Sequence, residues 1–229
     1  MRADARKNRD ALLDAAVDVF VEHGVDAPYD AIARRADLGI ATLYRHFPDR
    51  SALIRSIALR AFTAVTEVAV ELSRGGSAAS YLDDTKPEGA TPFLPSAAHA
   101  PQLAAFITAI SSMRLGAFMP SLLSVLATLD PDDDLRVALQ DMVGAVHALV
   151  ERCHQSGELR RDVSAEDVLL ALAVASRPLE GLPVAFNAQV MPRLLGLVVE
   201  GLRPRPDAAE LPQPPEPITG PGALGHRDR

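Results

Sequence analysis

The chain has 229 residues, of which 48% are apolar and 23% charged, a composition typical of a globular protein large enough for two structural units. Its single cysteine, Cys153, excludes an internal disulfide and a metal site built from several cysteines, and the N-terminal residues lack the apolar core of a signal peptide. The sequence contains no run of about 18 apolar residues, the length needed to span a bilayer. We therefore expect a cytoplasmic protein with no membrane partner.

The net charge of −7 argues against indiscriminate binding to nucleic acid, but the charge is unevenly distributed. Residues 1–60 contain ten basic and nine acidic residues, whereas residues 61–229 contain thirteen basic and twenty-one acidic ones. The first part of the chain is therefore close to neutral, and the remainder is expected to repel DNA.

The first predicted helix covers residues 6–23. Apolar residues recur on one side of it up to Phe20, and Gly24 is expected to end it in the left-handed conformation that glycine adopts at helix C-termini. Val25 would then pack on Phe20. The basic residues near the start could form an arm that adds salt-dependent affinity for DNA, or could simply fray; they are Arg2, Arg6, Lys7 and Arg9.

Two short helices separated by a tight turn follow, in a helix-turn-helix motif over residues 28–47. Apolar residues recur at helical spacing in each helix, at Ile32 and Ala36 in the first and at Leu43 and Phe47 in the second. Each helix therefore has one apolar side, and the residues between the two helices are predicted to form the turn.

The second short helix carries the predicted DNA-reading face. When residues are projected at about 100° per residue, Ala41 and Arg45 point away from the apolar side. Small residues allow close approach to a groove, a guanidinium can form two hydrogen bonds with guanine, and hydroxyl groups can reach backbone oxygens. An ordinary solvated helix face is the alternative interpretation. We predict that Ile40, Ala41 and Arg45 contact base edges. The other predicted DNA-contacting residues are Thr42, Tyr44, His46 and Arg50. Arg34 is predicted either to contact the DNA backbone or to make no contact.

Residues 36–54, which include the sequence TLYRHF, resemble the TetR family of bacterial transcriptional regulators. The resemblance is close over about residues 9–62 and only architectural beyond them. It implies that Thr42 and Tyr44 bind phosphate. It also implies that Arg50, at the start of the next helix, takes the phosphate-binding role that lysine usually fills in this family.

Three residues depart from the family pattern. Asp37 stands where the family usually has a turn glycine, Gly39 where a polar residue often caps the second helix, and Pro28 where threonine or serine often starts the first. Aspartate tolerates the left-handed backbone, glycine is an acceptable N-cap, and proline fits the first position of a helix. The fold is therefore expected to tolerate all three.

A long helix is predicted to begin at Pro48 and Asp49 and to continue to Gly75, with apolar residues at helical spacing. A helix of that length would span two domains and could transmit a change in the second domain to the first. Residues 75–101 are rich in Gly, Ser, Pro, Asp and Ala, and are predicted to form a long loop that lies over a ligand cavity or is disordered.

Further apolar helices are predicted after this loop. Two are expected within residues 102–129, meeting at a bend at Pro120, and another over residues 130–157, which end at a glycine. Ser164 and Asp167 are spaced as a capping box in front of the next helix.

Helices near residues 165–177 and 190–202 are predicted to form a homodimer interface. The first is apolar nearly all round, so it requires a partner on both sides, and the second is also strongly apolar. The family resemblance implies the same, because two such helices per subunit usually build a four-helix contact. Residues 204–229 are proline-rich with almost no large apolar residues, and are predicted to be a disordered tail.

Polar and polarizable residues within the apolar helices are candidate ligand-binding groups, although any one of them is more often a core or surface residue. Arg114 is the stronger candidate, because a charge between apolar helices requires an anionic partner. Cys153 beside His154 lacks a third ligand at metal spacing, so no metal site is predicted. The candidate ligand-binding residues are Met113, Arg114, Phe118, Met119, Leu122, His147 and Arg177.

The predicted fold class is all-α. An N-terminal three-helix helix-turn-helix domain, residues 1–62, is joined by a long helix to a C-terminal helical ligand-binding and dimerisation domain, residues 63–203. The predicted function is that of a ligand-responsive transcriptional regulator without a cofactor. A repressor is the preferred interpretation. It would bind a near-palindromic operator in double-stranded DNA as a homodimer and be released by an unknown small-molecule effector.

An activator or a regulator without an effector is an alternative. A different class, an all-helical enzyme that uses a histidine or cysteine, is weakly supported. The sequence contains no GxSxG elbow, no phosphate-binding glycine loop and no HExxH pair, so no enzymatic activity is predicted.

Overall fold

The computed structural model contains helices and no strands among the residues that it describes, and the predicted all-α class is confirmed. The predicted loop over residues 75–101 lies mostly outside the described part, as do residues 214–229. The described residues are 2–78, 101–127, 129–130, 133–177, 179 and 184–213. The elements are α1 (Arg2–His23), α2 (Tyr29–Arg35), α3 (Ile40–His46), α4 (Arg50–Ser73), α6 (Gln102–Ser112), the 3-10 helix η1 (Leu115–Phe118), α7 (Met119–Leu126), α8 (Asp134–Ser156), α9 (Ala165–Ala175) and α10 (Val184–Leu202).

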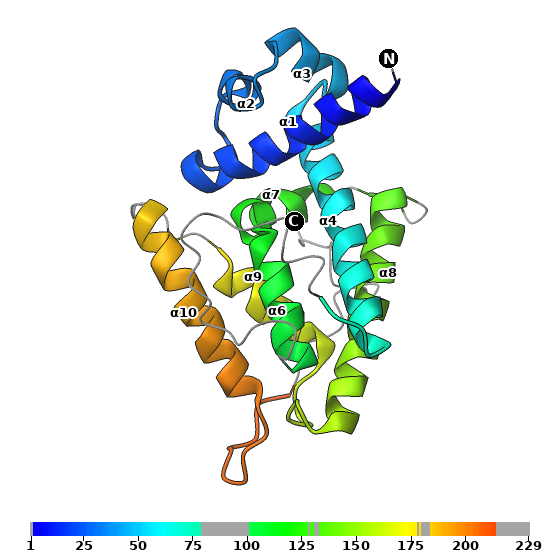
Figure 1. Ribbon diagram of the computed structural model, residues 1–229, viewed down its shortest axis with the longest axis vertical. Helices are drawn as coiled ribbons and strands as arrows, with labels where there is room; N and C mark the ends of the chain where they lie inside the picture. Colours follow the sequence, from blue (N-terminus) through cyan, green and yellow to red (C-terminus); the bar gives the residue numbers. More distant parts are fainter. Residues whose placement is uncertain are drawn as a thin grey trace, which may run out of the picture.

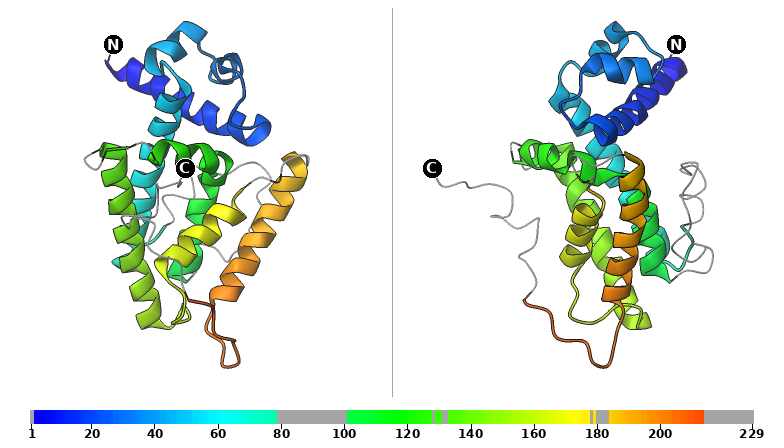
Figure 2. Two further views of the ribbon diagram at one scale, coloured as in Figure 1. Left: turned by 180° about the vertical axis from the view of Figure 1, so that it is seen from behind. Right: turned by 90° about the vertical axis from the view of Figure 1, so that its left-hand side faces the viewer.

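The helices form a small unit and a larger body, connected by α4 (Figure 1). Helices α1, α2 and α3 make the small unit at one end, and α4 runs from it into the body, where it packs along α8. Figure 2 shows the same arrangement from two other sides. One buried apolar core extends through both parts, from Leu12 in α1 to Leu202 in α10. Among the described helices, none is both long and apolar enough to cross a membrane.

Local backbone chemistry sets the ends of the first helices. Gly24 ends α1 with φ +79°, as predicted, and Asp37 in the turn between α2 and α3 has φ +53°. Gly39 is the N-cap of α3, also as predicted. Pro28 differs slightly from the prediction, because it is the N-cap of α2 and not its first residue. Its φ of −61° suits either position, and the missing N–H costs nothing at a helix start.

The later helix ends are also capped by local groups. Asp49 caps α4 by accepting a hydrogen bond of 2.8 Å from the Ala52 amide. Ser164 and Asp167 form the predicted capping box at the start of α9, each accepting a hydrogen bond from the other's backbone amide. Gly157 ends α8 in the left-handed conformation, with φ +75°.

The predicted bend at Pro120 is in the wrong place. Helix α6 ends at Ser112, and the chain turns at Arg114, which has φ +53°, before entering η1. Pro120 is instead the second residue of α7. A proline in the first turn of a helix loses no hydrogen bond, because the amides there have no partner within the helix. The residue therefore starts α7 and does not bend a longer helix.

Residues 204–213, the first part of the predicted tail, contact the α8–α9 connection and lie at the end of the molecule farthest from α1–α3 (Figure 1). Arg160 binds both carboxylate oxygens of Asp162 at 2.6 Å and donates to the Ala209 carbonyl at 2.5 Å. Asp162 in turn accepts a hydrogen bond of 3.0 Å from the Leu211 amide. These long-range contacts to the α8–α9 connection hold a segment whose composition alone suggests disorder.

The attachment of residues 204–213 is expected to depend on pH. The Arg160 guanidinium and the Leu211 amide lower the pKa of Asp162 from its ordinary value to about 2. Because the folded-state pKa is the lower one, the contribution is present above about pH 4 and is lost as the pH falls toward 2. Asp162→Asn should release the segment at neutral pH, seen as faster hydrogen exchange of the Leu211 amide. The exposed Glu210→Gln is the control and should leave that exchange unchanged.

Candidate nucleic-acid interface

Helix α3 is fixed to the small unit by one apolar side and leaves the other side in solvent. Leu43 is fully buried, and Phe47, directly after the helix, is 1% exposed. Ile40 and Tyr44 are among the exposed large apolar residues of the chain. The inward and outward sides that the sequence pattern predicts for α3 are therefore the ones that the structure shows.

The predicted DNA-contacting residues on α3 are not equally accessible. Ala41, Tyr44 and Arg45 are exposed, whereas Thr42 is half-buried. His46 is also half-buried, and its Nε2 lies in the interior without a hydrogen-bond partner among the described residues. The accessible surface is thus a small residue, an aromatic hydroxyl and a guanidinium, which suits approach to a groove and contact with base edges and phosphates.

The arginines of α2 are held by acidic neighbours. Arg34 is exposed and forms an ion pair with Asp30 at 2.8 Å, one turn earlier on the same helix. Arg35 contacts Glu22 and lies 3.5 Å from Asp18, both on α1. Exposed pairs of this kind contribute little to stability, so Arg34 can exchange its partner for a phosphate at small cost.

The position of Arg50 differs from the expectation that it offers its guanidinium to a phosphate. Nη1 donates to the Val25 carbonyl, and Nη2 donates to the Ala27 carbonyl at 2.8 Å. The guanidinium carbon lies 5.5 Å from the centre of the Tyr29 ring and 6.0 Å from that of Phe20. Each terminal nitrogen therefore makes a hydrogen bond within the protein, because the connection between α1 and α2 presents two carbonyls at the start of α4.

Tyr29 is a residue of this interface that the sequence analysis missed. Its ring lies 5.2 Å from that of Tyr44, so it connects the start of α2 with the exposed face of α3. Burial raises the pKa of Tyr29 to about 12, and its hydroxyl has no hydrogen-bond partner among the residues described. The only available signal was an aromatic residue at the start of the first helix of the motif, and that signal does not reveal its partner.

The candidate ligand-binding residues do not gather at one described site. Phe118 and Leu122 are buried in the core, and the side chain of Met119 lies outside the described part. His147 lies 2.9 Å from the buried Glu166 of α9. Met113 is half-buried and packs against the core. These positions support a structural role at least as well as a ligand-binding one.

Arg114 has the anionic partner that its chemistry requires, but the partner belongs to the protein. Nη1 of Arg114 lies 3.1 Å from Oδ1 of Asp18 on α1. The contact joins the turn between α6 and η1 to the small unit. Arg114 was predicted to attract an anion because of its apolar surroundings, and the fold supplies a carboxylate from 96 residues earlier in the chain.

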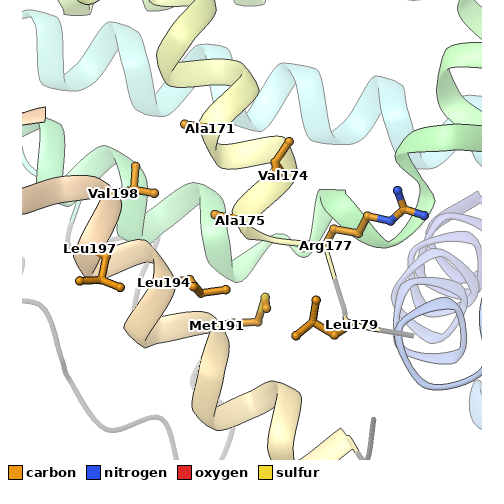
Figure 3. A pocket seen from close by; sticks show the side chains of 9 residues that line it. All are labelled: Ala171, Val174, Ala175, Arg177, Leu179, Met191, Leu194, Leu197 and Val198. Atoms are coloured by element: carbon orange, nitrogen blue, oxygen red, sulfur yellow. The ribbon is translucent and has the colours of Figure 1, made fainter. Parts of the chain in front are cut away.

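An open apolar groove runs between α9 and α10, with a volume of about 490 Å³. Figure 3 shows that facing side chains of the two helices line it. Arg177 is the member of the predicted ligand-binding set that reaches this groove. On α9, on α10 and in the connection between them, several large apolar side chains are exposed. They include Leu170, Val174, Leu179, Phe186 and Leu197.

Cys153 and the acidic and histidine side chains give no indication of a metal or redox site. Within the described residues, no group of three His, Cys, Asp or Glu could hold a metal ion. Cys153 is completely buried, and this burial raises the pKa of its thiol to about 12. The thiol therefore stays protonated at neutral pH and is a weak nucleophile.

Comparisons with known proteins agree with the geometry of both parts. Residues 12–57 match the family model described as bacterial regulatory proteins of the tetR family. Residues 100–204 match the model of the C-terminal domain of SbtR-like transcriptional regulators. An HTH-type transcriptional regulator of Staphylococcus aureus is 43% identical over 54 residues, which are 23% of this chain. The match spans only 29% of that relative's own length.

Solved structures are similar over most of the chain. A TetR transcriptional regulator from Streptomyces coelicolor is 31% identical, with a TM-score of 0.53, and the match covers 86% of this chain and 98% of that one. A TetR regulatory protein from Mycobacterium vanbaalenii is 26% identical, with a TM-score of 0.51 and coverage of 88% and 98%. The similarity therefore includes the helical body as well as the small unit.

Proposed function

The chain belongs to the TetR family of DNA-binding transcriptional regulators, which are not enzymes, and from this premise we propose that it is an effector-responsive repressor. It binds a near-palindromic operator as a homodimer and is released by a small molecule. We divide it into a reading domain of residues 1–62, an effector-binding and dimerisation domain of residues 63–203, and a tail. The observation that carries the proposal is the exposed face of α3 on a small unit attached to a body with an uncovered apolar groove.

The reading face is proposed to be the exposed side of α3. Ala41 allows the helix to approach the floor of the major groove, and Arg45 can form two hydrogen bonds with a guanine. Tyr44 can donate its hydroxyl to a phosphate beside the groove. One helix of seven residues contacts few bases, so useful discrimination requires two copies on the same side of the duplex.

The second copy is proposed to be another subunit bound through α9 and α10. The exposed apolar side chains around the groove belong to these two helices and the connection between them. Covering them removes apolar surface from water, and a two-fold axis would pair each helix with its equivalent. Two recognition helices would then enter successive major grooves roughly 34 Å apart.

Coupling between the two domains is proposed to run through charged contacts at their junction. Asp18 of α1 lies between Arg114 of the body, at 3.1 Å, and Arg35 of α2, at 3.5 Å. An effector that shifts the turn at Arg114 would change the restraint on α1 and α2. Because effector and operator prefer different arrangements, each must lower the affinity for the other by the same factor.

A second contact fixes the start of the connecting helix α4. Arg55 binds the two carboxylate oxygens of Asp133 at 2.8 and 2.6 Å, and also contacts Asp134. Asp133 is the N-cap of α8, where it accepts a hydrogen bond from the Leu135 amide. The Arg55 guanidinium is the main reason why the pKa of Asp133 is below its ordinary value. The proposed movement would pivot about this ion pair.

The test is Arg45→Ala, measured on an operator that the wild-type protein selects from random duplexes. We expect a loss of about 1 to 3 kcal/mol at the base that Arg45 reads, with relaxed preference at that position and little change elsewhere. The matched control is Arg74→Ala, an exposed arginine at the other end of α4. If Arg45→Ala kept both the affinity and the base preference of the wild type, the reading face would be misassigned.

A further inference from the structure

Arg50 stands at the start of α4, beside the small unit, and its side chain points into that unit. Its two terminal nitrogens donate to the carbonyls of Val25 and Ala27 in the connection between α1 and α2. Its planar group also lies over the faces of Phe20 and Tyr29. Attraction between a guanidinium and an aromatic face adds to these hydrogen bonds when water is excluded. Arg50 thus holds α1, α2 and α4 together at one point.

Tyr29 connects the residues held by Arg50 to helix α3. It is the first residue of α2, is 9% exposed, and lies against the Tyr44 ring with an angle of 47° between the ring planes. Because the Tyr29 hydroxyl is buried without a partner in the described part, ring packing is what the side chain contributes here. A displacement of Tyr29 would therefore reach Tyr44 directly.

Helix α3 depends on such contacts for its direction. It has seven residues, and a helix that short is not stable by itself in water. Leu43 is the residue within the helix that is buried in the core, and Phe47 follows at its end. Two anchors on one side fix the depth of the helix, and the contact between Tyr29 and Tyr44 on another side further restricts rotation about its axis.

We propose that Arg50 is a positioning residue that orients α3 for base reading, and that it is not a phosphate ligand. This inference rests on the proposed role of α3 as the recognition helix. Lysine keeps the positive charge, but its compact ammonium has no planar group that can lie over two rings while two separate nitrogens reach the two carbonyls. A phosphate ligand at this position could be replaced by lysine with little loss, whereas a positioning arginine could not.

The experiment compares Arg50→Lys with the wild type on two duplexes, the selected operator and a random sequence. We expect about tenfold weaker operator binding and nearly unchanged random-sequence binding. Loss of orientation removes base contacts, whereas binding to random sequence depends on cationic side chains, and lysine keeps the charge. The chain contains three tyrosines and no tryptophan, so near-ultraviolet circular dichroism reports on tyrosine packing. That signal should change in Arg50→Lys. It should not change in the control Arg60→Lys, on the same helix, where lysine can still pair with Asp14.

Arg50→Gln separates positioning from phosphate binding. A positioning role predicts that the slope of log affinity against log salt stays within roughly 0.3 of the wild-type value. Losing one phosphate contact in each subunit of the dimer would instead reduce the magnitude of that slope by about 1.8. The inference is overturned if Arg50→Lys binds the operator like the wild type, or if Arg50→Gln shows that lower slope. Should these variants fail to fold, Tyr29→Leu tests the same path, and it must lose operator selectivity at an unchanged salt slope. Arg45→Ala, measured in parallel, shows separately whether α3 reads bases at all.

Discussion

Val174→Glu is expected to split the dimer and to weaken binding to the operator strongly. Val174 is 74% exposed on α9 and lines the apolar groove between α9 and α10. In a dimer formed through this face, the glutamate would bring a charge among the apolar side chains of the groove, whose lining also includes Arg177, and taking that charge out of water would cost several kcal/mol. Since the side chain is exposed in the single subunit, the helical fold should be unaffected.

Sedimentation velocity at micromolar concentration should show single subunits for Val174→Glu. A mobility shift with the selected operator should be weaker by roughly 10³-fold, down to the affinity of a lone reading domain. Val137→Glu is a matched control, because Val137 is also an exposed valine on a helix, here α8, but lies outside the groove. It should leave both the mass and the operator affinity unchanged. A dimer of wild-type strength in Val174→Glu would place the subunit interface elsewhere.

The features that could be predicted from the sequence are those set by neighbouring residues. Gly24 ends α1, Gly39 caps α3, and the capping box of Ser164 and Asp167 begins α9, because each depends on backbone groups within a few residues. The inward and outward sides of α3 also follow from spacing alone. These local rules were sufficient for the helix-turn-helix and for most of the helix ends.

The contacts that could not be predicted join distant parts of the chain. Arg114 was expected to face a ligand, but its partner is Asp18, because nothing in the local pattern indicates which carboxylate the fold brings to it. Arg50 was expected to face DNA because the family pattern usually has a phosphate-binding lysine at this position. The two groups that it binds are backbone carbonyls, and the sequence of side chains does not indicate which carbonyls lie near it. Proline composition likewise concealed the contacts of residues 204–213 with Asp162.

Gly116→Ala is expected to destabilise the protein and to weaken operator binding from a position that does not face DNA. Gly116 lies in η1, against the backbone that follows α9, and an added Cβ would lie 2.6 Å from the Arg177 amide nitrogen and from the Ser176 carbonyl carbon. Backbone atoms cannot give way as a flexible side chain would, so η1 or the end of α9 must shift. Overpacking of this kind costs about 1 to 3 kcal/mol of unfolding free energy.

The same shift should reach the reading domain, because η1 begins next to Arg114 and its contact with Asp18. A looser turn would let α1 and α2 take a wider range of positions, so operator affinity should fall about fivefold or more while binding to random DNA stays unchanged. Urea unfolding and operator titration measure the two effects.

Gly144→Ala provides the opposite expectation within the same experiment. Gly144 lies in the middle of α8, and no atom outside its own helix backbone and chain neighbours comes within 4 Å of an added Cβ. Alanine loses less conformational freedom on folding, so the variant should be more stable by about 0.5 to 1 kcal/mol, with unchanged operator affinity. If Gly116→Ala lowered stability but left operator affinity at the wild-type value, η1 would be a packing element without a role in coupling, and the path through Arg114 would have to be abandoned.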